Sequence, residues 1–192
     1  MKTLIHYKLQ RIEELINKLL VLNKLYISRS FTFDTELLSF MEECETLFEQ
    51  LGENSNKSKV SQLTVYFEIA KKGVNPLTLE KLRTGKRENS WIAAFHVLDN
   101  MSTILQDSID KIEFELNQSR ELIEQVVLSA IQSKMISESE IKELSKQESL
   151  QMLWKKLTDN EQVKLVERKL KLTVTQDDIF ILLDKVFTKI NA

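Results

Sequence analysis

The two histidines are the residues of this sequence best suited to hold a metal or to move a proton. A di-iron or di-manganese site in a helical bundle needs Glu-x-x-His pairs whose side chains point inward. No acidic residue precedes His6, and the residue three before His96 is Ala93, so neither histidine belongs to such a pair. Asp99 follows His96 at a spacing typical of a hydrogen-bonded pair on a helix surface. We therefore expect no metal site and no cofactor.

The remaining reactive side chains form no recognisable catalytic motif. Cys44 is the only cysteine; its place on an apolar helix face favours a buried, unreactive thiol, and no disulfide can form within the chain. Three nearby glutamates point in different directions on a helix, so we interpret them as a solvated acidic face. The sequence has neither a Gly-rich phosphate loop nor a G-x-S-x-G elbow. We expect no catalytic residue and a protein that is not an enzyme.

A basic cluster is the main candidate for a charged binding site. It comprises Lys81, Arg83, Lys86 and Arg87, in the turn just before the long apolar-patterned stretch 90–134. Arginine forks beside a helix N-terminus can bind a phosphate or a nucleic-acid backbone. The simpler interpretation, which we prefer, is a solvated end of a bundle that complements acidic helices.

An aromatic turn spans residues 30–34, with the sequence Ser-Phe-Thr-Phe-Asp. Thr32 or Asp34 can cap the helix that follows, and Phe31 and Phe33 can close the end of a helical bundle. An exposed aromatic patch that binds a partner is the alternative interpretation.

The composition predicts that helices position all of these residues. Apolar residues make up 42% and charged residues 29% of the chain, as in a folded protein, and the net charge of −2 gives no general affinity for nucleic acid or anionic membrane. Three glycines and one proline among 192 residues leave little turn chemistry for a sheet. No apolar run approaches the length of a membrane span, and the N-terminus lacks a signal-peptide core. We expect an all-α protein in the cytoplasm.

Apolar spacing and capping motifs predict nine helices. The three glycines are each expected to end one, and the Thr-x-x-Glu and Thr-x-x-Asp motifs at 158–161 and 175–178 to begin one. Similar motifs start at Ser137 and Ser145, and the alternating residues 170–175 predict an extended connector. The expected helices are 3–27, 35–51, 59–72, 76–85, 90–134, 138–146, 147–157, 159–170 and 176–190.

Charge alternates along the first 134 residues. The net charges are +4 for residues 1–29, −7 for 34–53, +5 for 57–89 and −4 for 90–134. Short loops make consecutive helices antiparallel neighbours, so opposite charges meet on adjacent surfaces. This pattern predicts an up-down-up-down bundle at 1–135, built around the long fourth helix, and a small helical module at 136–192.

The long helix 90–134 also gives the leading functional hypothesis. It would measure about 67 Å, whereas the first helix is much shorter, so its apolar second half needs cover from the C-terminal helices, a second copy or a partner chain. We expect a non-enzymatic adaptor or assembly subunit that acts through coiled-coil-like protein contacts. The alternatives are an anion- or nucleic-acid-binding regulator that uses the basic cluster and, third, a helical-bundle enzyme. The candidate interface residues are Leu116, Leu122, Ile123, Val126, Val127, Ala130 and Ile131.

Overall fold

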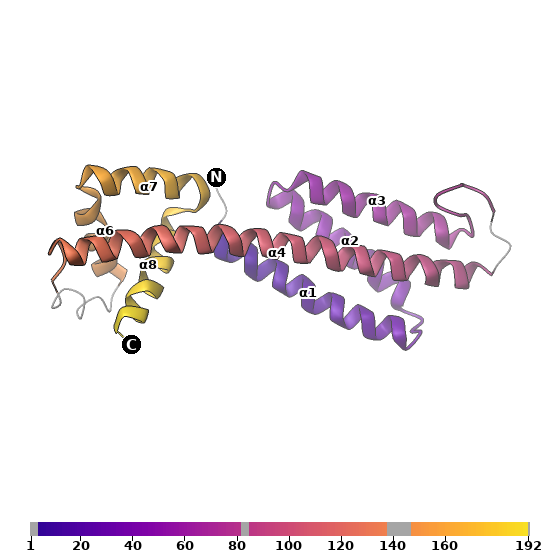
Figure 1. Cartoon of the computed structure of the whole chain (residues 1–192). Helices are drawn as coiled ribbons and strands as arrows, with labels where there is room; N and C mark the ends of the chain where they lie inside the picture. Colours follow the sequence, from indigo (N-terminus) through magenta and orange to yellow (C-terminus); the bar gives the residue numbers. More distant parts are fainter. Residues whose placement is uncertain (1–3, 82–84, 138–146, 192) are drawn as a thin grey trace. The chain divides into compact units, whose positions relative to one another are not determined.

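The computed structural model describes residues 4–81, 85–137 and 147–191, and this part of the chain is all-α, as expected (Figure 1). Its only β-type pairing is an isolated bridge between Val74 and Lys81. Within the described ranges, no helix is long and apolar enough to cross a membrane. The helices are α1 (Ile5–Ile27), α2 (Phe33–Gln50), α3 (Asn54–Lys71), α4 (Lys86–Gln132), α6 (Gln147–Thr158), α7 (Glu161–Thr173) and α8 (Gln176–Asn191).

Contacts within the chain define two compact units. We call residues 10–110 the bundle unit, and residues 1–9 together with 111–192 the terminal unit. Helices α1 and α4 each contribute residues to both. The division into parts at 1–135 and 136–192, expected from the sequence, stays a prediction.

The bundle unit packs α1, α2 and α3 beside the first half of α4 (Figure 1). Its apolar faces are buried as the helical spacing predicts, with Ile12, Leu37, Phe67 and Leu105 inaccessible to solvent. Two ion pairs follow the alternation of charge. Lys18 of α1 lies 2.6 Å from Glu43 of α2, and Lys57 of α3 lies 2.9 Å from Glu49 of α2. Such exposed pairs contribute at most about 1 kcal/mol each, so apolar burial stabilises the unit and charge favours this arrangement of neighbours.

Two of the three glycines end helices as expected. Gly52 and Gly73 have φ of 73° and 77°, the left-handed conformation that glycine adopts without steric cost at the end of a helix. The expectation for Gly85 is wrong. It precedes α4, and its carbonyl accepts hydrogen bonds from the N–H groups of Glu88 and Asn89 at the start of that helix.

The short helix expected at 76–85 does not form over its described part, residues 76–81. The side chain of Asn75 accepts a 2.8 Å hydrogen bond from the N–H of Leu77, which makes an Asx-type turn instead of a helix cap. Leu79 then adopts a left-handed φ of 60°, and the chain returns to the bridge between Val74 and Lys81. The hydrogen bond from the Leu77 N–H to the Asn75 side chain therefore stabilises a turn in place of the helix expected to begin at Pro76.

In the terminal unit, α6, α7 and α8 surround the second half of α4 (Figure 1). Helix α4 continues without interruption through the polar residues 117–121. Large buried side chains from all of these helices form the core. They include Ile123, Val127, Trp154, Leu157, Leu170, Ile179 and Leu183.

Two expectations for this unit are wrong. Residues 170–173 belong to α7, in which Leu170 is buried, and Val174, directly after this helix, is extended. Thr158 ends α6 by donating to the carbonyl of Lys155, and Asn160 is the residue that caps α7, accepting from the N–H of Gln162 at 2.9 Å. The helix expected at 138–146 lies outside the described residues, as do Glu140 and Ser145 of the two capping motifs that begin at Ser137 and Ser145.

Candidate binding surface

Exposed and half-buried aromatic and arginine side chains, together with one isoleucine, gather at one end of the bundle unit. They come from the last residues of α1, the turn before α2 and the first turns of α4. Helix α1 ends where Arg29 takes a left-handed φ of 53° and the N–H of Ser30 bonds to the carbonyl of Leu25. We call this group the arginine–aromatic surface. Its members are Tyr26, Arg29, Phe31, Arg87, Trp91, Ile92 and Phe95.

The two phenylalanines of the turn have opposite environments. Phe33 is 0% exposed and packs against the rings of Tyr26 and Trp91, with centroid distances of 5.6 and 5.1 Å. Phe31 is 91% exposed. One phenylalanine therefore closes the bundle, whereas the other is free to contact a partner.

Ring stacking fixes the position of Trp91 at the centre of this surface. Its indole lies parallel to the ring of Tyr26, with centroids 5.0 Å apart and planes 10° apart. Phe95, one turn later on α4, approaches Tyr26 at 6.5 Å and is exposed, as is Ile92. Buried Phe33 supports the cluster from inside, so the exposed apolar side chains rest on a rigid base.

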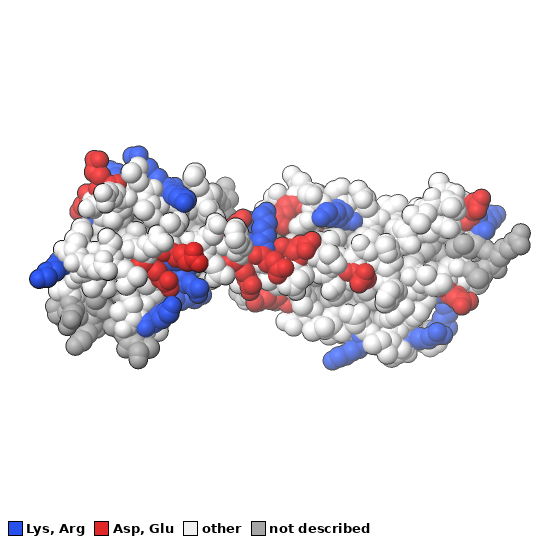
Figure 2. Space-filling model, viewed as in Figure 1, with Lys and Arg blue, Asp and Glu red and all other residues white. Residues whose placement is uncertain are grey.

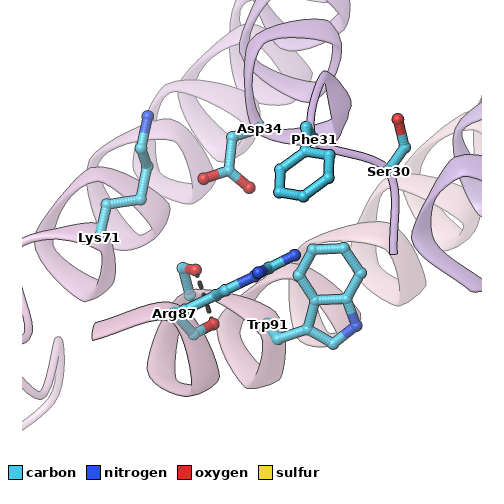
Figure 3. Close-up of a pocket in the computed structure, with 7 residues that line it drawn as sticks. Ser30, Phe31, Asp34, Lys71, Arg87 and Trp91 are labelled. Atoms are coloured by element: carbon cyan, nitrogen blue, oxygen red, sulfur yellow. Dashed lines mark hydrogen bonds between the residues drawn. The ribbon is translucent and has the colours of Figure 1, made fainter. Parts of the chain in front are cut away.

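A pocket of about 330 Å³ opens beside Trp91 (Figure 3). The guanidinium carbon of Arg87 lies 5.1 Å from the centroid of Phe31, a cation–π contact. Figure 3 shows this guanidinium directed toward the space between the rings of Phe31 and Trp91. The pocket is lined by Ser30, Phe31, Asp34, Lys71, Arg87, Ser90 and Trp91.

Positive charge exceeds negative charge among the side chains that line this pocket. Lys71 and Arg87 are cationic and Asp34 is anionic. Lys71 also lies 3.7 Å from Glu68 on the same helix, a long and partly exposed pair that competes only weakly for its charge. Within the described part of the chain, no carboxylate lies within 4 Å of the Arg87 guanidinium. Its hydrogen-bonding edge is open to an external acceptor.

The structure brings together only part of the basic cluster singled out in the sequence. Arg87 lines the pocket, as does Lys71 of α3. Lys81 is exposed in the preceding loop and is not a lining residue. Arg83 and the side chain of Lys86 lie outside what the structure describes. The ring partner of Arg87 is thus Phe31, which is distant in sequence.

One face of the second half of α4 is covered within the terminal unit, whereas Phe114 and Leu128 are exposed. Among the candidate interface residues, Leu116, Leu122 and Ile131 are half-buried, whereas the other four are buried. A groove of about 320 Å³ nevertheless remains between α4 and α7. Its apolar lining consists of Leu122, Val126, Ala130, Met135, Val163 and Val166.

Both histidines form hydrogen bonds with side chains of the chain. His96 contacts Asn100 at 3.3 Å and the ring of Tyr66, and the expected pairing with Asp99 is not observed. His6 Nδ1 lies 2.9 Å from a carboxylate oxygen of Asp178, and Lys185 Nζ lies 3.3 Å from its other ring nitrogen. No group of three potential metal ligands occurs among the described residues.

The carboxylate of Asp178 accepts several hydrogen bonds from residues at the starts of α1 and α8. Asp178 is fully buried, and its carboxylate accepts bonds from the N–H groups of Ile5 and Thr175, both at 3.0 Å, as well as from His6. Burial alone would raise the pKa of Asp178, but the hydrogen bonds from these three residues outweigh burial and hold its pKa below the ordinary value of 3.8. The carboxylate therefore joins the N-terminus of α1 to that of α8.

Cys44 is buried, as the sequence predicts. Burial raises the pKa of its thiol, and neighbouring Glu43 and Glu45 raise it further, whereas Lys18 acts in the opposite direction. Such a thiol carries almost no thiolate at neutral pH and is unsuited to nucleophilic chemistry.

Comparison of the chain with protein-family models, with curated proteins and with solved structures found no match. Any functional interpretation therefore rests on the surfaces described above.

Proposed function

We propose that this protein is a non-enzymatic helical adaptor or assembly subunit, located in the cytoplasm, that binds a partner protein through the arginine–aromatic surface. Tyrosine, tryptophan and arginine are the residue types most enriched at the energetic centres of protein interfaces. Here they are held on a rigid helical scaffold. Among the described residues there is no metal-binding cluster, and Cys44 is buried, so neither feature supports an enzymatic function.

The observation that carries this proposal is the position of Phe31. Burying a phenylalanine side chain stabilises a protein by about 1.5–3 kcal/mol. Phe31 is 91% exposed, so the fold does not gain this stabilisation. Neighbouring Phe33 shows that the bundle buries a phenylalanine where it needs one. Phe31 also contacts the charged side chain of Arg87. Such a charged group can fix the orientation of a bound partner and increase its affinity.

The groove between α4 and α7 supports a second contact of the same kind. It contains three of the candidate interface residues, Leu122, Val126 and Ala130. The argument that the whole second half of α4 requires another chain is weakened, because Ile123, Val126, Val127 and Ala130 are already buried within the terminal unit. The groove is therefore secondary in this proposal.

Nucleic-acid binding is the alternative function. An exposed aromatic ring beside Arg87 and Lys71 resembles the stacking platforms that bind single strands. Such proteins also need a continuous positive path for the backbone. On the face shown in Figure 2, lysine and arginine are interspersed with acidic side chains, which favours protein over nucleic acid as the partner.

Affinity capture from an extract of the native host tests the proposal. Tagged wild-type protein and Phe31→Ser should be compared by quantitative mass spectrometry, with Leu165→Ser as the control, because Leu165 is also exposed but lies on α7. We expect at least one protein to be retained by the wild type and the control and lost with Phe31→Ser. Identical recovery with all three baits would contradict the proposal.

A further inference from the structure

We infer that the pocket between Lys71 and Arg87 binds an aspartate or glutamate carboxylate of the partner, and that an apolar side chain next to that acidic residue covers Phe31. This inference rests on the proposed protein-binding function and specifies the chemistry of the partner. It identifies the partner segment as acidic and apolar.

The charges of the pocket lining set the charge of the occupant. Lys71 and Arg87 contribute two positive charges, and Asp34 contributes one negative charge. One further negative charge neutralises the pocket, and a carboxylate supplies that charge. A phosphate monoester carries close to two negative charges at neutral pH, so Asp34 would repel it more strongly than it repels a carboxylate.

The geometry of Arg87 favours a planar acceptor. Its guanidinium is held against the ring of Phe31 at 5.1 Å, so fewer conformations of the side chain are lost when a partner binds. The N–H edge remains available, because no described carboxylate forms an ion pair with it. A guanidinium binds a carboxylate through two parallel hydrogen bonds, which also fixes the direction of the partner chain.

Phe31 explains why an apolar residue should adjoin the carboxylate. Its ring forms one wall of the pocket and is otherwise open to solvent. An apolar side chain placed on this ring would exclude water from the pocket and strengthen the charged hydrogen bonds inside it.

Selection from a displayed library of random twelve-residue peptides, using the full-length protein as bait, tests the inference. We expect enriched peptides to carry Asp or Glu beside a large apolar residue. A synthetic copy should bind at least about tenfold more tightly than its Glu→Gln or Asp→Gln analogue. The affinity of this peptide for the Arg87→Gln variant should be lower by a similar factor. Its affinity for the control variant Arg120→Gln, changed at an exposed arginine of the terminal unit, should equal that for the wild type.

The outcomes separate the inference from the function on which it rests. If enriched peptides lose affinity with Phe31→Ser but not with Arg87→Gln or Lys71→Gln, protein binding survives and the acidic partner is refuted. Peptides that are insensitive to all three substitutions would refute both. Binding of a fluorescent oligothymidine at physiological salt that requires Arg87 would overturn the carboxylate assignment in favour of nucleic acid.

Discussion

His6 and Asp178 lie 172 residues apart in the sequence, yet the imidazole Nδ1 and a carboxylate oxygen are 2.9 Å apart in the terminal unit. The same carboxylate accepts backbone N–H groups at the starts of both α1 and α8. Helix N-termini carry partial positive charge, so one buried aspartate compensates two of them at once. This contact ties the start of the chain to its last helix.

Asp178→Asn should destabilise the protein by about 2–3 kcal/mol, because the amide cannot accept all of the bonds that the carboxylate accepts. The free energy of unfolding in urea measures the effect. Asp177→Asn is the matched control, since Asp177 is the neighbouring, exposed residue of the same helix turn. It should change stability by less than about 0.5 kcal/mol. Equal effects of the two substitutions would rule out the capping role of Asp178.

The stabilising effect of Asp178 should depend on pH. Its pKa is lower in the folded than in the unfolded state, so its contribution is present above 3.8 and is lost as the pH falls through the folded pKa. The difference in unfolding free energy between wild type and Asp178→Asn should therefore be smaller at about pH 3 than at neutral pH. A difference that stays constant over this range would show that the charge of Asp178 does not matter.

Sequence patterns predict local structure well in this protein and distant contacts poorly. The Thr-x-x-Asp motif correctly marks the start of α8, because the capping bonds join residues three apart: Asp178 receives the N–H of Thr175 at 3.0 Å. Nothing local indicates that Ile5 and His6 bond to the same carboxylate. The alternating charges of the first helices, in contrast, predicted the neighbours of α2, since Lys18 and Lys57 both pair with it.

Phe31 and Phe33 should respond to substitution in opposite ways. Phe33→Ala should cost about 3–5 kcal/mol of stability, because it leaves a cavity among packed rings. Phe31→Ser should change stability by less than about 0.5 kcal/mol, because its ring is exposed. Urea unfolding of both variants checks this. A large loss of stability with Phe31→Ser would mean that Phe31 belongs to the fold and would undermine its use in the capture experiment.

The second half of α4 should behave as core at Ile123 and as surface at Leu128. Ile123→Asp places an unpaired charge at a fully buried position and should cost more than about 3 kcal/mol or unfold the terminal unit. Leu128→Asp, on the exposed side of the same helix, should be tolerated. Circular dichroism and urea unfolding distinguish the two. A folded and stable Ile123→Asp variant would show that the C-terminal helices do not cover this residue.

The candidate surface itself was only partly accessible to sequence reasoning. The aromatic turn and the basic cluster are both visible in the sequence, but Phe31 and Arg87 are 56 residues apart. Which phenylalanine would be exposed depends on how the bundle closes. Arg87 meets Phe31 only because α4 begins beside the end of α1. Lys71, a basic residue upstream of the cluster in the sequence, lines the same pocket from α3.

The most direct test of the central claim is site-specific photo-crosslinking in the native host. A photoreactive phenylalanine analogue should replace Phe31 in one variant and exposed Leu165 of α7 in the other. We predict a discrete crosslinked protein from position 31 that is absent from position 165 and is reduced by Arg87→Gln. No adduct from position 31, or the same adducts from both positions, would contradict the claim that the arginine–aromatic surface binds a partner protein.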